Sequence, residues 1–121
     1  MNKLDQARQL KCRTLDYAVK IIRLCEIISR QETARVLGKQ LLRCGTSMAA
    51  NYRAACRSKS PADFISKMGT VVEETDETLF WLELLVQANL LTFEMAQPLV
   101  QEATELLRIF SKSLSTAKHN L

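Results

Sequence analysis

Apolar side chains recur at steps of three and four residues through four segments of the chain, which is the spacing of one face of an α-helix. The four segments are residues 11–30, 34–58, 61–89 and 93–115. Short connections between consecutive helices favour antiparallel neighbours. The pattern therefore predicts an all-α protein, in which residues 1–121 form a single domain folded as an antiparallel up-down-up-down four-helix bundle.

The first segment is apolar around most of its circumference. Its polar side chains fall on one narrow stripe, which contains Arg13, Asp16, Lys20, Arg23, Glu26 and Arg30. A helix on the surface of a bundle needs an apolar stripe only about 100° wide to cover its own core. The excess apolar surface predicts burial against something outside the protomer, most simply a second copy of the chain.

The second segment combines a core row with many small side chains. The expected core row is Leu37, Leu41, Gly45, Met48, Tyr52 and Ala55. The small side chains along this segment allow another helix to approach closely. Ser47 and Asn51 lie one turn apart beside the core row. Because a buried Asn without partners costs about 1–3 kcal/mol, we expect Asn51 to hydrogen-bond a neighbouring helix and to fix its register.

The start of the third helix is marked by a capping pattern. Ser60 is suited to the N-cap, Pro61 to the first helical position, and Asp63 to the exposed amides of the first turn. Farther along, Glu73, Asp76 and Glu83 are expected to face outward. Trp81 shares a boundary stripe with Glu74 and Glu77, where either an intersubunit contact or half-burial within the protomer suits it.

The fourth segment has a clear apolar face but an ambiguous start. Its face consists of Leu99, Ala103, Leu106, Leu107, Phe110 and Leu114. Pro98 lies either in the first turn of this helix or at a kink in a helix that begins near Thr92. Residues 115–121 are expected to fray.

Composition agrees with a compact helical protein of 121 residues and 13.7 kDa. With only 3 Gly and 2 Pro, the chain has few of the turn residues that a β-sandwich requires. No window approaches the roughly 18 uninterrupted apolar residues of a membrane span, and the charged amino terminus does not resemble a signal peptide. We therefore expect a cytoplasmic protein with no membrane association.

The residues needed for common catalytic and metal sites are not grouped in this sequence. Cys12, Cys25, Cys44 and Cys56 form no CxxC pair, so we expect free, mostly packed thiols and no zinc site. The single histidine, His119, lies in the tail, where neither a Glu-x-x-His metal site nor a Ser–His or Cys–His pair can be assembled. The sequence predicts no enzyme, with no catalytic residues, no metal and no cofactor.

Charge is divided unevenly between the two halves of the chain. Residues 1–60 contain 13 Lys and Arg against 4 Asp and Glu, a net charge of +9, whereas residues 61–121 contain 4 against 9, a net charge of −5. A basic surface can bind nucleic-acid phosphates. The candidate residues for this are Arg35, Lys39, Arg43, Arg53, Arg57 and Lys59. The alternative is that carboxylates of the third helix neutralise these cations within the bundle or between subunits.

A family resemblance accompanies these patterns. Its motifs are the run from Leu41-Leu42-Arg43 through Ser47 to Asn51, then Arg57-Ser58, Asp63-Phe64-Ile65 and finally Glu77-Thr78-Leu79-Phe80-Trp81-Leu82-Glu83-Leu84-Leu85. In their order and spacing, over about residues 10–115, the chain resembles the four-helix bundle proteins encoded in intervening sequences of bacterial 23S rRNA genes. It departs from them after Asn51, where Asn51-Tyr52-Arg53-Ala54-Ala55-Cys56 lacks an acidic residue that the family often has.

The resemblance implies a homopentameric ring without an established enzymatic activity. One relative, the accessory variability determinant of diversity-generating retroelements, works with a reverse transcriptase and nucleic acid. The resemblance therefore favours a non-enzymatic homo-oligomer that associates with RNA or DNA with little sequence specificity, and it adds a protein partner such as a reverse transcriptase as a further candidate. The alternative is a protein-interaction scaffold or accessory subunit whose charges serve subunit and partner contacts.

Positions that match the family carry over residue by residue. Ser47, Asn51, Phe64, Glu77 and Trp81 match its packing positions, and Arg43 and Arg57 match its basic ones. Together with the boundary stripe of the third helix, this makes a set of candidate structural or oligomer-interface residues. The set is Ser47, Asn51, Glu74, Glu77 and Trp81.

Overall fold

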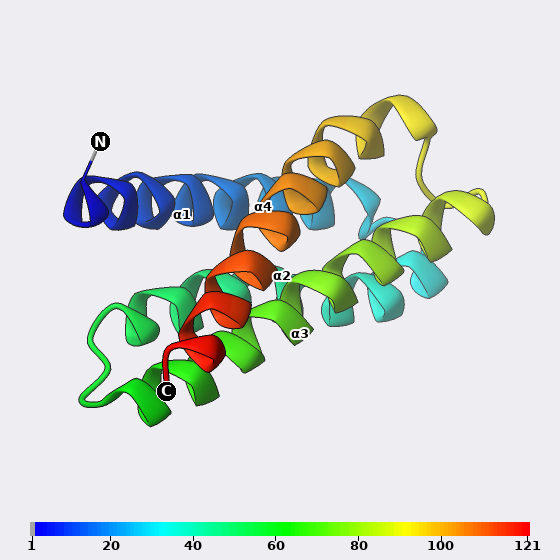
Figure 1. The fold of residues 1–121 in the computed structure, drawn as a ribbon. Coiled ribbons are helices and arrows are strands. Elements are labelled where there is room, and N and C mark those ends of the chain that lie inside the picture. The colour runs from blue at the N-terminus through cyan, green and yellow to red at the C-terminus, as the bar shows by residue number, and fades with distance from the viewer. Residues whose placement is uncertain (1) are drawn as a thin grey trace.

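The computed structural model describes residues 2–121, which form four long helices joined by short turns. The helices are α1 (Lys3–Ile28), α2 (Glu32–Ala55), α3 (Pro61–Gln87) and α4 (Phe93–His119). Successive helices run in opposite directions (Figure 1). Residues 2–121 contain no strand. The prediction of an all-α four-helix bundle is confirmed.

The bundle is splayed at one end. α2 packs on both α1 and α3, and α4 packs on α3, but α1 and α4 contact each other over only a short stretch. In that stretch the hydroxyl of Tyr17 donates to the backbone carbonyl of Leu99 at 3.0 Å, and Arg13 donates to Glu102 at 2.6 Å. Beyond it the amino-terminal half of α1 and the carboxy-terminal half of α4 diverge (Figure 1).

The core runs through all four helices, and α1 and α2 approach closely within it. Its largest fully buried side chains include Tyr17, Ile21, Leu41, Met48, Met68, Leu82, Leu85, Leu106 and Phe110. At the closest approach, a Cβ atom added to Gly45 would lie 3.0 Å from Cγ2 of Ile21. The prediction that small residues of the second helix admit a neighbouring helix is confirmed at this position.

The helix starts follow the capping residues. Ser60 caps α3 as predicted, because its Oγ accepts from the amide of Asp63 at 3.0 Å and Pro61 follows it. The expected start of the first helix near residue 11 was wrong. α1 begins at Lys3, where the side chain of Asn2 accepts from the amide of Asp5 at 2.8 Å. The first two turns of α1 are mostly exposed, so they lack the apolar periodicity from which a helix is predicted.

The start of α4 resolves the position of Pro98. Thr92 is the N-cap, and its Oγ1 accepts from the amide of Met95 at 3.2 Å. Pro98 therefore lies inside a helix that begins next to Thr92, beyond its first turn, so the start given by the second alternative is confirmed, whereas a kink at Pro98 stays a prediction. The expected fraying from residue 115 was wrong, because α4 remains helical to His119. Lys118 lies in its last turn, where a cation interacts favourably with the helix dipole.

Candidate nucleic-acid interface

The fold separates the six cations predicted to bind nucleic acid. Arg35 and Lys39 lie in the first half of α2, whereas Arg53 lies in its last turn, at the opposite end of the helix. Arg35 pairs with Glu32 of the same helix at 2.7 Å, so its charge is already balanced locally. The six residues therefore do not form one surface.

Arg43 is neutralised by α3, as the alternative interpretation of the charge pattern predicted. Its Nη1 lies 3.2 Å from Oε2 of Glu74, and its Nη2 donates to Glu77. The hydrogen bond to Glu77 raises the pKa of the Arg43 guanidinium further. The ion pairs of Arg43 with Glu74 and Glu77 therefore link α2 to α3, so Arg43 is not free to bind a phosphate.

Arg53, Arg57 and Lys59 remain as a free group at the α2–α3 turn. All three side chains are exposed and form no ion pair within residues 2–121. The backbone amide of Lys59 donates to Asp63 at 3.0 Å, while the Lys59 side chain itself is exposed. A hydrogen bond from Lys67, together with this amide, lowers the pKa of Asp63. The carboxylate of Asp63 thus binds the Lys67 side chain and a backbone amide just before α3.

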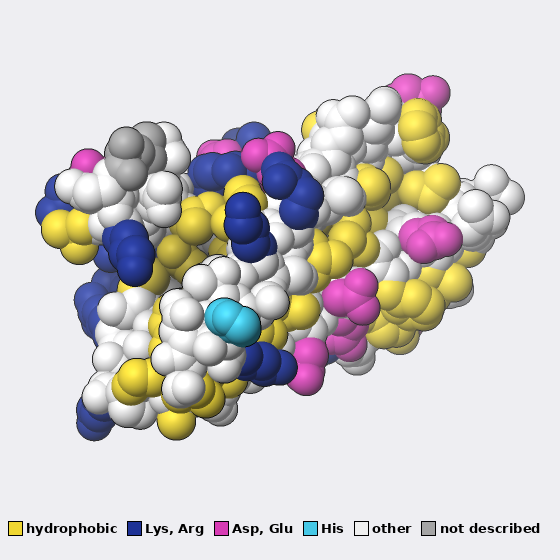
Figure 2. Space-filling view, in the orientation of Figure 1, with side chains coloured by type: hydrophobic (Ala, Val, Ile, Leu, Met, Phe, Trp, Pro, Cys, Tyr) yellow, Lys and Arg dark blue, Asp and Glu magenta, His cyan; other side chains and the backbone are white. Residues whose placement is uncertain are grey.

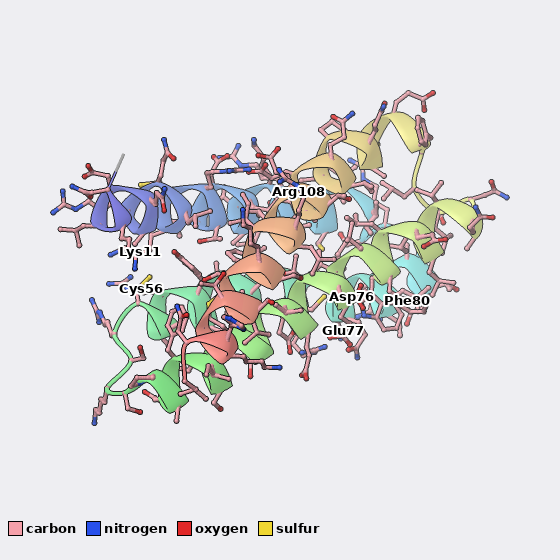
Figure 3. All side chains as sticks on the ribbon, viewed as in Figure 1. Lys11, Cys56, Asp76, Glu77, Phe80 and Arg108 are labelled. Carbon is pink, nitrogen blue, oxygen red and sulfur yellow. The ribbon has the colours of Figure 1, made fainter. Side chains whose placement is uncertain are left out.

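The fold adds cations from two other segments to this group. They come from the first half of α1 and the second half of α4 and are Lys3, Arg8, Lys11, Arg108, Lys112 and Lys118. Because successive helices alternate in direction, these segments end on the same side of the bundle as the α2–α3 turn (Figure 1). Lys11 points from α1 towards Cys56 at the end of α2 (Figure 3).

The cations of α4 are not apparent from the charge of the two halves of the sequence, because the half that contains them is acidic overall. Arg108, Lys112 and Lys118 belong to residues 61–121, whose net charge is −5. Only the direction of α4 shows that they join the other cations. A run of basic residues after the last carboxylate, Glu105, was the signal in the sequence that could have indicated this group.

We define the basic end as residues 2–13, 53–67 and 108–121. It contains 11 Lys and Arg against 2 Asp and Glu, a net charge of +9, whereas the rest of the chain contains 6 against 11, a net charge of −5. In the view of Figure 2, Lys and Arg lie over the side of the molecule where these segments end and over its middle, whereas most acidic side chains lie over the middle and the opposite side. The charge is therefore polarised along the bundle.

Eight cations of the basic end have no ion-pair partner in the part of the chain that the structure describes. They are Lys3, Lys11, Arg53, Arg57, Lys59, Arg108, Lys112 and Lys118. Together these charges create a positive electrostatic potential, which attracts an anionic polymer. Long, solvated cationic side chains without a fixed geometry suit contact with phosphates better than discrimination between bases.

Asn51 does not reach a neighbouring helix. Its Nδ2 donates to the carbonyl and to Oγ of Ser47, at 2.9 and 2.8 Å, so both bonds stay within α2. The expectation that Asn51 fixes the register of another helix was wrong. The side chain is only half-buried, and at that depth the preceding turn offers it two acceptors of its own helix.

Trp81 is half-buried in the protomer, which was one of the two alternatives for this boundary position. The ring of Phe80 meets the Trp81 ring edge-on, with centroids 5.0 Å apart and an angle of 74° between the planes. The Nε1 atom of Trp81 is buried and has no hydrogen-bond acceptor within residues 2–121. A role for Trp81 at an oligomer interface stays a prediction.

The expectation of mostly packed thiols was wrong for two of the four cysteines. Cys12 and Cys56 are exposed, Cys25 is half-buried and Cys44 is buried. Within residues 2–121, no three His, Cys, Asp or Glu side chains are grouped as metal ligands would be. None of the four helices has an apolar stretch long enough to cross a bilayer, as far as residues 2–121 are concerned.

Comparisons with known proteins agree with this architecture. Residues 9–112 match the family model of the 23S rRNA-intervening sequence protein. The chain is similar to the crystal structure of a protein with unknown function from the S23 ribosomal protein family from Bacteroides thetaiotaomicron. The two are 35% identical, with a TM-score of 0.81, over 86% of this chain and 96% of that one. No curated protein matches the chain.

Proposed function

This chain belongs to the 23S rRNA-intervening sequence protein family, and on that premise we propose that it is a non-enzymatic, homo-oligomeric protein of the cytoplasm that binds RNA or DNA phosphates. The binding surface is the basic end, not the set of six cations expected from the sequence. The observation that supports this most directly is the group of eight exposed cations that have no ion-pair partner within residues 2–121, carried by three segments that end on one side of the bundle (Figure 1).

The binding is electrostatic and has little sequence specificity. Each phosphate neutralised by Lys or Arg releases counterions, so the logarithm of the binding constant falls by about 0.9 per phosphate for each tenfold rise in salt on duplex DNA. Side chains that bind phosphates fix the position of a nucleic acid but do not distinguish its bases. The proposal therefore requires a steep salt dependence and similar affinities for unrelated sequences.

Self-association is the second part of the proposal. Leu15, Val19 and Ile22 lie on one side of α1, at spacings of four and three residues, and are 65%, 38% and 42% exposed. The core of the protomer therefore leaves these three apolar side chains of α1 uncovered, which supports the proposal. A second copy of the chain would cover this stripe, and five copies are the number that the family resemblance implies.

A pair of matched variants tests the proposed binding surface. Arg57→Gln removes a cation that has no ion-pair partner in the described part of the chain, whereas Arg43→Gln removes one that Glu74 and Glu77 already neutralise. Fluorescence anisotropy with labelled duplex RNA and duplex DNA at several salt concentrations measures both affinity and salt slope. We expect Arg57→Gln to weaken binding about two- to fivefold and to make the slope shallower by about one, and Arg43→Gln to change the affinity less than twofold.

Three results would contradict this assignment. One is that the wild-type protein binds neither nucleic acid at about 0.05 M salt. Another is an affinity that does not respond to salt. The third is an equal loss in the two variants, because paired and unpaired arginines would then contribute alike and the basic end would not be the binding surface.

A further inference from the structure

The outer face of α3 carries a row of acidic side chains around one exposed aromatic ring. Glu73, Asp76, Phe80 and Glu83 follow one another at spacings of three, four and three residues. They are exposed, and the Phe80 side chain is 52% exposed. Ten residues of helix span roughly 15 Å, so the row covers about three turns. We call this row the α3 face.

The carboxylates of the α3 face have no counterpart in the protomer. Glu73, Asp76 and Glu83 form no ion pair within residues 2–121, in contrast to Glu74 and Glu77, which bind Arg43 on the flank towards α2. Like charges three or four residues apart destabilise a helix slightly. The α3 face therefore concentrates negative charge that ion pairs within residues 2–121 do not neutralise.

Phe80 is held outward at the centre of this charge. Its ring makes a T-shaped contact with the ring of Trp81, a side chain that is itself half-buried. Asp76 and Phe80 lie on the same side of α3 (Figure 3). An aromatic face flanked by carboxylates suits the guanidinium or ammonium group of a partner and the aliphatic stem that carries it.

We propose that the α3 face is a docking surface for a basic amphipathic helix of a protein partner. The partner would place Lys or Arg at three- and four-residue spacing against Glu73, Asp76 and Glu83, and one apolar or cationic side chain on Phe80. Charge complementarity selects this partner, because nucleic acids and anionic membranes are repelled by the same carboxylates. The α3 face and the basic end then serve two different ligands on one molecule.

The proposal is tested with a synthetic probe. The probe is a fluorescein-labelled, Ala-rich helical peptide with Lys and one Leu on a single face, at alternating three- and four-residue spacing. A second peptide has the same composition, with Lys distributed around the helix. We expect the wild-type protein to bind the first peptide at least about fivefold more tightly than the second, because only the first can align its cations with the row.

Two charge-matched double variants locate the binding. Glu73→Gln with Glu83→Gln removes two carboxylates from the α3 face, and Glu26→Gln with Glu94→Gln removes two exposed carboxylates elsewhere. We expect the first pair to weaken peptide binding about fivefold or more and the second less than twofold. Phe80→Ala is expected to weaken it about threefold. Binding of duplex nucleic acid should stay within twofold in all of them, which separates this test from that of the basic end.

The proposal is overturned if both peptides bind alike, or if the two double variants lose affinity equally, because the protein would then attract cations without a defined face. It is also overturned if light scattering shows that Glu73→Gln with Glu83→Gln lowers the molecular mass of the assembly. In that case the occupant of the α3 face is a second copy of the chain.

Discussion

Burial divides the four cysteine side chains into two reactive classes. Cys44 is fully buried, and the hydroxyl of Thr78 lies 3.3 Å from its sulfur. Cys25 is half-buried and contacts the carbonyl of Gly38 at 3.4 Å. Burial raises the pKa of both thiols, in Cys25 from an ordinary 9.0 to about 11. Cys56, in contrast, is exposed at the basic end.

Thiol labelling should distinguish these classes. In a Cys12→Ser background, a thiol reagent such as DTNB at pH 8 should modify Cys56 within minutes and Cys25 and Cys44 at least about a hundredfold more slowly, because only the thiolate reacts. All three should react at similar rates in denaturant. Mass spectrometry of quenched samples identifies the modified residue, and rapid labelling of Cys44 in the native protein would contradict the assigned burial.

The three glycines, all within helices, differ in the space that is available for a side chain. At Gly45 of α2, an added Cβ would lie 3.0 and 3.1 Å from two atoms of Ile21, which is fully buried. At Gly38 the nearest atom, in Ile28, would be 3.5 Å away, an ordinary contact, and at Gly69 no atom would lie within 4 Å. Only Gly45 is required by the approach of α1 and α2.

Alanine substitutions should show this difference in stability. Gly45→Ala is expected to lower the free energy of unfolding by about 1 kcal/mol or more, because overpacking outweighs the gain in helix propensity. Gly69→Ala should raise it by about 0.5–1 kcal/mol, because the gain in propensity meets no clash. Chemical denaturation followed by circular dichroism measures both. An increase in the stability of the Gly45→Ala variant would contradict this prediction, because it would show that Ile21 can shift to accommodate the added methyl group between α1 and α2.

For the molecule as a whole, the uneven distribution of charge arises from the order and direction of the helices. The basic end contains the start of α1, the α2–α3 turn and the end of α4, which are far apart in the sequence. The α3 face lies outside these segments. The apolar stripe of α1, which contains Leu15, Val19 and Ile22, adds a third kind of surface. One small bundle thus carries three surfaces of different chemistry.

The apolar stripe predicts a specific response of the assembly to mutation. Light scattering should give the wild-type protein a mass several times the 13.7 kDa of the monomer. Leu15→Lys with Val19→Lys should reduce it to the monomer mass without loss of helical circular dichroism, because two ammonium groups cannot be buried unpaired at an interface. Val36→Lys, at an apolar residue of α2 that is 51% exposed, is the control and should leave the assembly intact.

Two outcomes would contradict this prediction. A wild-type protein that scatters as a 13.7 kDa monomer at micromolar concentration would exclude the assembly. Dissociation by Val36→Lys alone would place the contact on α2 instead of α1.

By itself, the sequence determined the helices and the side chains that form their core. The apolar spacing and the Ser60 cap are local signals, because a helix is defined by contacts within a few residues. The excess apolar face of α1 was equally visible, since it follows from counting side chains around one helix. The start of α1 was missed because a capped but polar turn leaves no apolar pattern.

Only the tertiary structure decided which charges are free and which lie together. Arg43 was a candidate for phosphate binding until α3 placed Glu74 and Glu77 against it. The cations at the end of α4 belonged to an acidic half of the sequence until the direction of the helix carried them to the basic end. The physical reason is that ion pairing and electrostatic potential depend on distance in space, which sequence separation does not report.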